Sequence, residues 1–220
     1  MRGLWVRRNE SIFEDIFKSP SQVISIAQND LKEYKQALQM NKVALRNNEE
    51  GESRTLRWEK PRTGSVKANW DAAVDKKQRR VGLGVLIRDE DGKPLVAVEG
   101  QKDNVDHPVV AEAQALWKAM VICRDLRLEK VIFEGDAQVI VKAVNNASED
   151  FSVYGSLTEG IKHLLKGRTN WTVQYTHRSN NAAAHTLAKE SLHSQTELVW
   201  IEDIPDSIQR IVKRECHCIE

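Results

Sequence analysis

Three acidic residues lie at positions where a folded protein rarely places an acid for structural reasons alone. Asp71 lies in the middle of a strand-like segment, residues 66–74, and Glu112 lies at the start of an apolar helical segment. Asp136 lies just after the apolar run 131–133. Asp is depleted from strand interiors, and carboxylates are rarely buried without a compensating charge. Because clustered carboxylates are common ligands of Mg²⁺, the sequence predicts a divalent metal site.

Each acid also has a structural alternative. Asp136 could be the N-cap of a following helix. Glu112 could be a first-turn acid that interacts favourably with the helix dipole. Asp71 could be a solvated acid on an edge strand. Taken jointly, in this order along the chain, the three residues favour the metal site.

Four sequence blocks around these acids resemble the signature blocks of type 1 ribonuclease H domains. They resemble most the plant reverse-transcriptase-like group, which descends from non-LTR retrotransposons. The blocks are residues 69–73, 111–116, 133–137 and 178–188, and the resemblance runs from about residue 66 to residue 192. It implies an endonuclease that hydrolyses the RNA strand of RNA–DNA hybrids and leaves 5′-phosphate and 3′-hydroxyl ends. Such an enzyme would recognise RNA through its 2′-OH groups and the duplex shape.

The resemblance also implies which residues bind metal and catalyse the reaction: Asp71, Glu112, Asp136 and His185. The implied cofactor is two Mg²⁺ or Mn²⁺ ions, which together stabilise the attacking and leaving oxygens of an in-line displacement. His185 departs from the family pattern, which usually has Asp there. Imidazole is a softer, neutral donor that suits Mn²⁺ better than Mg²⁺. The alternative for His185 is a helix-surface residue without a ligand role.

Nucleic-acid contacts are predicted at two places. One is the basic segment between the first two strands, and the other is the signature blocks themselves. The predicted residues are Lys76, Lys77, Arg79 and Arg80 in the basic segment, and Asn69, Arg178 and Asn181 in the blocks. A charged hairpin tip is the alternative for the basic segment. The chain has 33 Lys and Arg against 32 Asp and Glu, a net charge of +1, so binding must depend on local patches.

The elements that must position these residues are those of a mixed α/β domain. Alternating apolar and polar residues predict a strand over residues 66–74, with Asp71 on the face opposite Trp70. Further strands are predicted at residues 81–87, 95–98, 130–134 and 171–175, and helices at residues 109–120, 136–145, 156–166 and 181–192. The first three strands form an antiparallel meander. The resemblance implies a ribonuclease H-like fold, with a five-stranded mixed sheet in the order 3-2-1-4-5 between helices. Gly82 and Gly84 indicate close backbone packing within the second strand.

The chain divides into four segments: an N-terminal helical segment 1–45, a polar linker 46–64, a ribonuclease H-like domain 65–193 and a C-terminal tail 194–220. Trp58 could dock the end of the linker, and a final helix is predicted over residues 200–212. The N-terminal helices have apolar faces that could pack on the main domain or on a protein partner.

Composition predicts an intracellular protein, nuclear or cytoplasmic and not secreted. No apolar run reaches the length of a membrane span, and the first residues lack a signal-peptide pattern. An odd number of cysteines, 3 in all, indicates a reducing compartment.

We therefore expect a metal-dependent ribonuclease whose partner is an RNA–DNA hybrid. One alternative is a catalytically weak or inactive ribonuclease H-fold domain that binds nucleic acid. Another is a protein-interaction module that uses the N-terminal helices and keeps the acids as remnants. The three intact acids favour the enzyme, whereas His185 and the near-neutral net charge favour the inactive domain.

Overall fold

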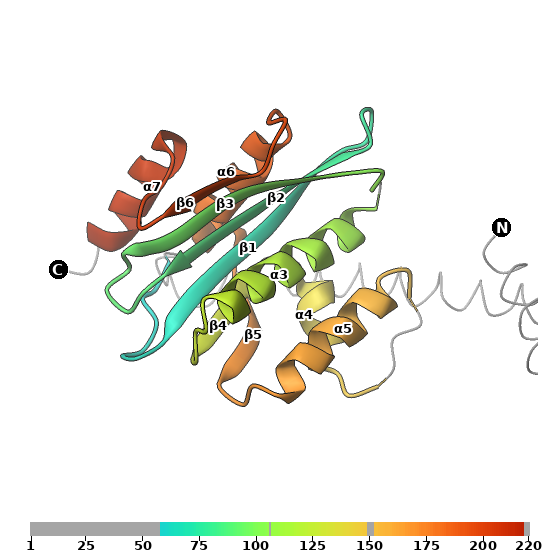
Figure 1. Cartoon of the computed structure of the whole chain (residues 1–220), viewed down its shortest axis with the longest axis horizontal. Coiled ribbons are helices and arrows are strands. Elements are labelled where there is room, and N and C mark those ends of the chain that lie inside the picture. Colours follow the sequence, from blue (N-terminus) through green and yellow to red (C-terminus); the bar gives the residue numbers. More distant parts are fainter. Residues whose placement is uncertain (1–57, 106, 149–151, 218–220) are drawn as a thin grey trace, which may run out of the picture. The chain divides into compact units, whose positions relative to one another are not determined.

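The computed structural model describes residues 58–105, 107–148 and 152–217 (Figure 1). The predictions for the N-terminal helical segment and for most of the linker lie outside these residues. The strands are β1 (Val66–Asp75), β2 (Arg80–Arg88), β3 (Pro94–Asp103), β4 (Val131–Gly135), β5 (Trp171–Tyr175) and β6 (Leu198–Ile201). The helices are α3 (Pro108–Asp125), α4 (Gln138–Asn145), α5 (Gly155–Lys166), α6 (Ala182–Ser191) and α7 (Asp206–His217), with a 3₁₀ turn η1 (Arg178–Asn180) before α6. No helix in these ranges is both long and apolar enough to cross a membrane.

The strands form one mixed sheet in the order β5-β4-β1-β2-β3-β6. Strands β1, β2 and β3 are the predicted antiparallel meander, whereas β4 lies parallel to both β1 and β5. The predicted order 3-2-1-4-5 and the ribonuclease H-like fold class are therefore confirmed. Strand β1, which carries Asp71, lies near the middle of the sheet with hydrogen-bonded neighbours on both sides.

A sixth strand corrects the predicted strand count. Residues 198–201 pair antiparallel with β3, although a helix was predicted to begin at residue 200. This run of apolar, β-branched and aromatic residues fits a strand. Pro205 disfavours helical backbone in the residue before it, so α7 begins only at Asp206. Strand β3 also continues to Asp103, because polar residues beyond Val98 keep pairing with β2.

Helices cover the sheet on both faces (Figure 1). Helices α3, α4 and α5 enclose the larger core on one face, around Trp70, Leu116, Phe133, Ile140 and Ile161. Helices α6 and α7 pack on the other face, around Leu86, Leu187 and Ile208. Successive residues of β1 therefore alternate between the two layers, as predicted, with Trp70 in the larger core and its neighbours Asn69 and Asp71 on the opposite side.

Helix α6 lies directly on the backbone of β2 at Gly82 and Gly84. A Cβ atom at Gly82 would lie 2.1 Å from the carbonyl oxygen of Ala188, and one at Gly84 would lie 2.1 Å from that of Ala184. Both obstructing atoms belong to the helix backbone, so they cannot move away without the whole helix. The two glycines thus set the height of α6 above the sheet and, with it, the position of His185.

We expect Gly84→Ala to destabilise the fold by about 1–3 kcal/mol, because the added methyl group forces α6 away from β2. Urea unfolding measures the effect. Gly167→Ala is the matched control, since a Cβ there meets nothing within 4 Å. Equal stability of the two variants would show that α6 does not depend on this close approach.

Candidate metal and active site

Three carboxylates that are far apart in sequence meet at one place. Asp71 comes from the middle of β1, Glu112 from α3, and Asp136 directly follows β4. Each offers one carboxylate oxygen, and these oxygens all lie within 4.8 Å of one another. Asp71 is buried and the other two are half-buried. The structure therefore assembles the cluster that the sequence predicted.

The structural alternatives for these acids are wrong. Asp71 lies on a central strand, so it is not an edge-strand acid. Helix α3 begins at Pro108, which places Glu112 beyond the first turn, where the helix dipole acts most strongly. The N-cap residue of α4 is Ala137, so Asp136 does not cap that helix. The predicted helix starts, residues 109 and 136, were misplaced by one and by two residues, and the observed starts exclude the first-turn and N-cap roles.

Burial and mutual repulsion make the cluster costly in the absence of a cation. Burial, and then the nearby Asp136 carboxylate, raise the pKa of Asp71 to about 6. Burial, followed by the charges of Asp71 and Asp136, raises the pKa of Glu112 well above its ordinary value. The Oε2 atom of Glu112 is buried and has no hydrogen-bond partner among the described residues. An unsatisfied oxygen beside two further carboxylates is a donor set that fits a divalent cation.

His185 lies beside the cluster and contacts Asp71. Its Nδ1 atom is 2.6 Å from Oδ2 of Asp71, and its Nε2 atom is 3.0 Å from a terminal guanidinium nitrogen of Arg178. A guanidinium group can only donate, so Nε2 accepts from Arg178 and the ring proton sits on Nδ1, which donates to Asp71. This bond lowers the pKa of Asp71 and partly offsets the effect of burial.

His185 is not an isolated residue on the surface of α6, because its side chain is half-buried and contacts a cluster carboxylate. Both ring nitrogens are engaged, by Asp71 and by Arg178. In this arrangement His185 holds Asp71. Its predicted role as a fourth metal ligand stays a prediction.

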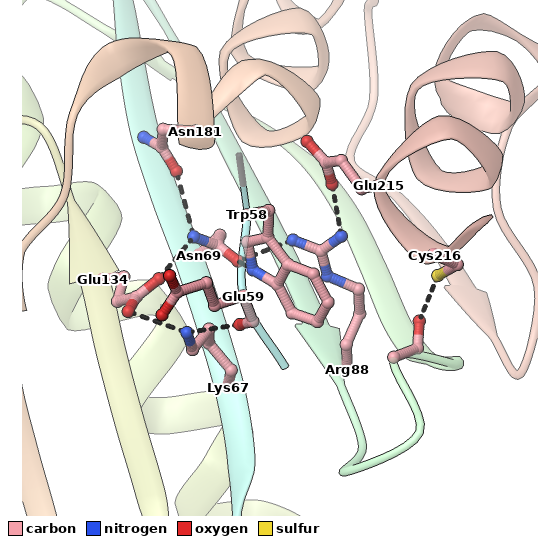
Figure 2. Close-up of polar contacts among 10 residues, drawn as sticks. Trp58, Glu59, Lys67, Asn69, Arg88, Glu134, Asn181, Glu215 and Cys216 are labelled. Carbon is pink, nitrogen blue, oxygen red and sulfur yellow. Dashed lines mark hydrogen bonds and ion pairs between the residues drawn. The ribbon is translucent and has the colours of Figure 1, made fainter. Parts of the chain in front are cut away.

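Asn69 and Asn181, two of the residues predicted to contact nucleic acid, lie inside the protein. Both are 1% exposed. Asn181 donates to the backbone oxygen of Trp70 at 2.9 Å. Its own oxygen accepts from Asn69 at 3.3 Å (Figure 2). Their amide groups are satisfied inside the protein, and these hydrogen bonds fix the start of α6 against β1, close to Asp71.

Sequence reasoning missed a buried polar network that surrounds Asn69 (Figure 2). The Oδ1 atom of Asn69 accepts from Trp58 and from Arg88, each at 2.9 Å. Arg88 stacks 3.4 Å from the centre of the Trp58 ring and forms an ion pair with Glu215 of α7. Trp58, which the sequence suggested could dock the end of the linker, is 2% exposed.

A second ion pair extends this network along β1. Lys67 lies 2.9 Å from Glu134 of β4, which also accepts from Gln174 at 2.6 Å. The sequence did contain one indication of this network. Lys67, Asn69 and Asp71 are three polar residues on one face of a central strand. Such a row indicates a buried polar layer that must find its partners on neighbouring elements.

The predicted basic segment lies at the β1–β2 turn. Lys76, Lys77 and Arg79 are exposed, and Arg80 lies 3.5 Å from Asp103 of β3. Arg178 is exposed as well, with one nitrogen bonded to His185. These residues are accessible to a ligand, and their contact with nucleic acid stays a prediction.

Comparisons with known proteins agree with the geometry. A family model described as "Reverse transcriptase-like" matches residues 69–191, a span that holds the carboxylate cluster and His185. None of the curated proteins matches the chain.

Solved ribonucleases H resemble this structure. RNase H1 from the halophilic archaeon Halobacterium salinarum has a TM-score of 0.54 and 22% identity, over 59% of this chain and 98% of that one. LC11-RNase H1, isolated from compost by a metagenomic approach, has a TM-score of 0.55 and 21% identity, over 60% of this chain and 97% of that one. The same LC11 enzyme in complex with an RNA/DNA hybrid has a TM-score of 0.53 and 21% identity, over 59% and 97% of the two chains. At these identities the likeness establishes a common fold.

Proposed function

Since the chain belongs to the reverse transcriptase-like family, we propose that it is a metal-dependent endonuclease that hydrolyses the RNA strand of RNA–DNA hybrids. The observation that carries this proposal is the group of three carboxylates, whose oxygens lie within 4.8 Å of one another. Support for the substrate comes from a structural neighbour that has been solved with an RNA/DNA hybrid. The plant and retrotransposon ancestry implied by the sequence blocks belongs to the same proposal.

Asp71, Glu112 and Asp136 would hold the cofactor, which we propose to be two Mg²⁺ or Mn²⁺ ions. Carboxylate oxygens are the ligands that both ions prefer. When bound, the ions would stabilise the attacking and leaving oxygens and lower the pKa of the attacking water.

The remaining side chains position the acids. Asp71 is held by a strand with partners on both sides, and the Nδ1–H group of His185 fixes its Oδ2 atom. Arg178 sets the tautomer of His185 and brings a positive charge that lowers the pKa of Glu112. The cluster is thereby preorganised, since little side-chain reorientation is needed when substrate arrives.

The test is cleavage of a labelled RNA–DNA hybrid by the full chain, with Mg²⁺ or Mn²⁺ and with a chelator. We expect products from the RNA strand only, and none when the metal is chelated. A DNA duplex and an RNA duplex of the same sequence are the substrate controls. Cleavage that persists in the chelator, or that is equal on the DNA duplex, would refute the proposal.

One observation favours a second candidate function, a ribonuclease H-fold domain that binds hybrids without efficient turnover. Histidine stands where the family usually has a fourth acid, and both of its ring nitrogens are already engaged. In that case the full chain would bind the hybrid and a divalent cation, and the cleavage assay would show no metal-dependent product.

The raised pKa of Asp71 predicts how metal affinity depends on pH. A cation must displace any proton on this carboxylate, so affinity should rise as pH increases through about 6. Calorimetric titration with Mn²⁺ at pH values on either side of about 6 measures the change. Affinity that is constant across this range would show that Asp71 is not a ligand.

The raised pKa of Asp71 also predicts how the stability of the metal-free protein changes with pH. The pKa of Asp71 is higher in the folded protein than its ordinary value of 3.8, so the folded state binds the proton more tightly. The metal-free protein should therefore lose about 3 kcal/mol of stability as pH rises from about 4 to about 6, between the ordinary and the folded-state pKa. Asp71→Asn should remove this part of the pH dependence, and added Mg²⁺ should oppose it. Thermal unfolding at acidic and neutral pH checks both expectations.

A further inference from the structure

A basic pocket lies at the place where α3 ends and β4 and β5 begin. Its volume is about 410 Å³. Three arginines line it, Arg124, Arg127 and Arg168, against one acid, Glu129. The chain as a whole is almost neutral, so this lining is a local concentration of positive charge.

Two of these guanidinium groups have charge available for a ligand. Arg168 lies 4.7 Å from the centre of the Trp171 ring and donates to the backbone oxygen of Leu164, so its side chain is held in place. Trp171 is itself anchored, because it is 5% exposed and its Nε1 atom donates to the backbone oxygen of Leu128. Arg127 has no ion-pair partner in the described ranges, whereas Arg124 is paired with Asp125.

The pocket and the carboxylate cluster lie at opposite ends of the same two strands. Val131 and Trp171 are paired at the start of β4 and β5, and Gly135 and Tyr175 are paired at the end, next to Asp136. Five strand residues span roughly 13 Å between the first and last Cα atoms. Phosphates on one strand of a duplex advance by about 3.4 Å for each base pair, so a substrate longer than a few base pairs can extend from one end to the other.

We propose that this pocket binds a backbone phosphate of the nucleic-acid substrate, at a second site remote from the carboxylates. The chemistry is the recognition of phosphate oxygens by guanidinium groups, which match them in geometry and charge. The choice of a nucleic-acid phosphate rests on the proposed function, whereas the preference for an anion follows from the lining itself.

The test measures binding of a long labelled hybrid to the full chain, with a chelator present so that no strand is cut. Two variants are compared with wild type. One carries Arg127→Ser alone, and the double variant carries both Arg127→Ser and Arg168→Ser. Affinity should fall by about tenfold in the double variant, and the slope of log affinity against log salt should decrease by about 0.9 for each phosphate that the variant no longer neutralises. Arg210→Ser is the matched control, because it removes the same charge from an exposed position on α7.

Affinity and salt slope equal to those of Arg210→Ser would overturn the proposal. So would a result in which the variants lose inorganic phosphate binding but keep hybrid affinity, since the pocket would then bind only a small anion. Arg127 is exposed and makes no ion pair among the described residues, so Arg127→Ser tests the pocket even if the double variant folds poorly. Failure of the proposed function gives a different result: pocket-dependent binding would persist while the cleavage assay stays negative.

Discussion

Replacing Asp71 with Asn is expected to lower the rate of hybrid cleavage by at least about 100-fold while the fold stays intact. Asp71 is the most buried of the three acids and the only one that lies within a strand. The substitution removes a negative charge that would hold the cations but keeps the shape of the side chain. An amide oxygen can still accept the hydrogen bond from Nδ1 of His185.

The measurement is the rate of product formation with saturating Mg²⁺ or Mn²⁺, together with circular dichroism and an unfolding curve for each variant. Asp91→Asn is the matched control, because it makes the same chemical change at an exposed turn between β2 and β3. A rate for Asp71→Asn equal to that of wild type would mean that the cluster is not the active site. Unfolding of the variant would instead show that this aspartate is needed for structure.

Replacing Glu215 with Ala is expected to destabilise the protein by about 3–5 kcal/mol, because it leaves the charge of Arg88 buried and unpaired. The Arg88 side chain is 1% exposed, and its Nε atom has no partner among the described residues. Burial lowers the pKa of Arg88, and the Glu215 carboxylate counteracts that effect. The pair joins α7 to the sheet, so its loss should also loosen the packing of this helix.

Urea unfolding of Glu215→Ala and of the double variant Arg88→Met with Glu215→Ala separates the charge from the packing. The double variant should be more stable than Glu215→Ala alone, since no unpaired charge stays buried. Glu159→Ala is the surface control, because Glu159 pairs with Lys162 but is 46% exposed; its cost should be at most about 1 kcal/mol. If Glu215→Ala costs no more than this control, the buried pair does not stabilise the fold.

Tertiary packing decided what several polar residues do. Asn69 and Asn181 belong to signature blocks, yet their exposure depends on Trp58, Arg88 and the start of α6, which meet them only in the folded chain. The pairing of Arg88 with Glu215 joins residues 127 positions apart. No local pattern encodes such a contact, because the burial of a charge is set by the elements packed around it.

The sequence did not reveal strand β6 or the orientation of His185 either, because both depend on contacts between distant segments. An edge strand of 4 residues has too few positions to show a periodicity, and its pairing with β3 is non-local. The tautomer of His185 follows from the positions of Asp71 and Arg178 on either side of its ring. Residue type alone could not distinguish a metal ligand from a hydrogen-bond donor.

The sequence by itself determined the mixed α/β class and most strands and helices, because the alternation of apolar and polar residues is a local feature. It also singled out the three acids as candidate metal ligands, because a carboxylate in an apolar setting is visible locally. The strand order came from the resemblance of four blocks and was confirmed by the sheet. Only the tertiary structure brought oxygens of Asp71, Glu112 and Asp136 to within 4.8 Å of one another. That proximity depends on parallel pairing of β1 with β4 and on the packing of α3 against β1, and both are interactions between segments distant in the chain.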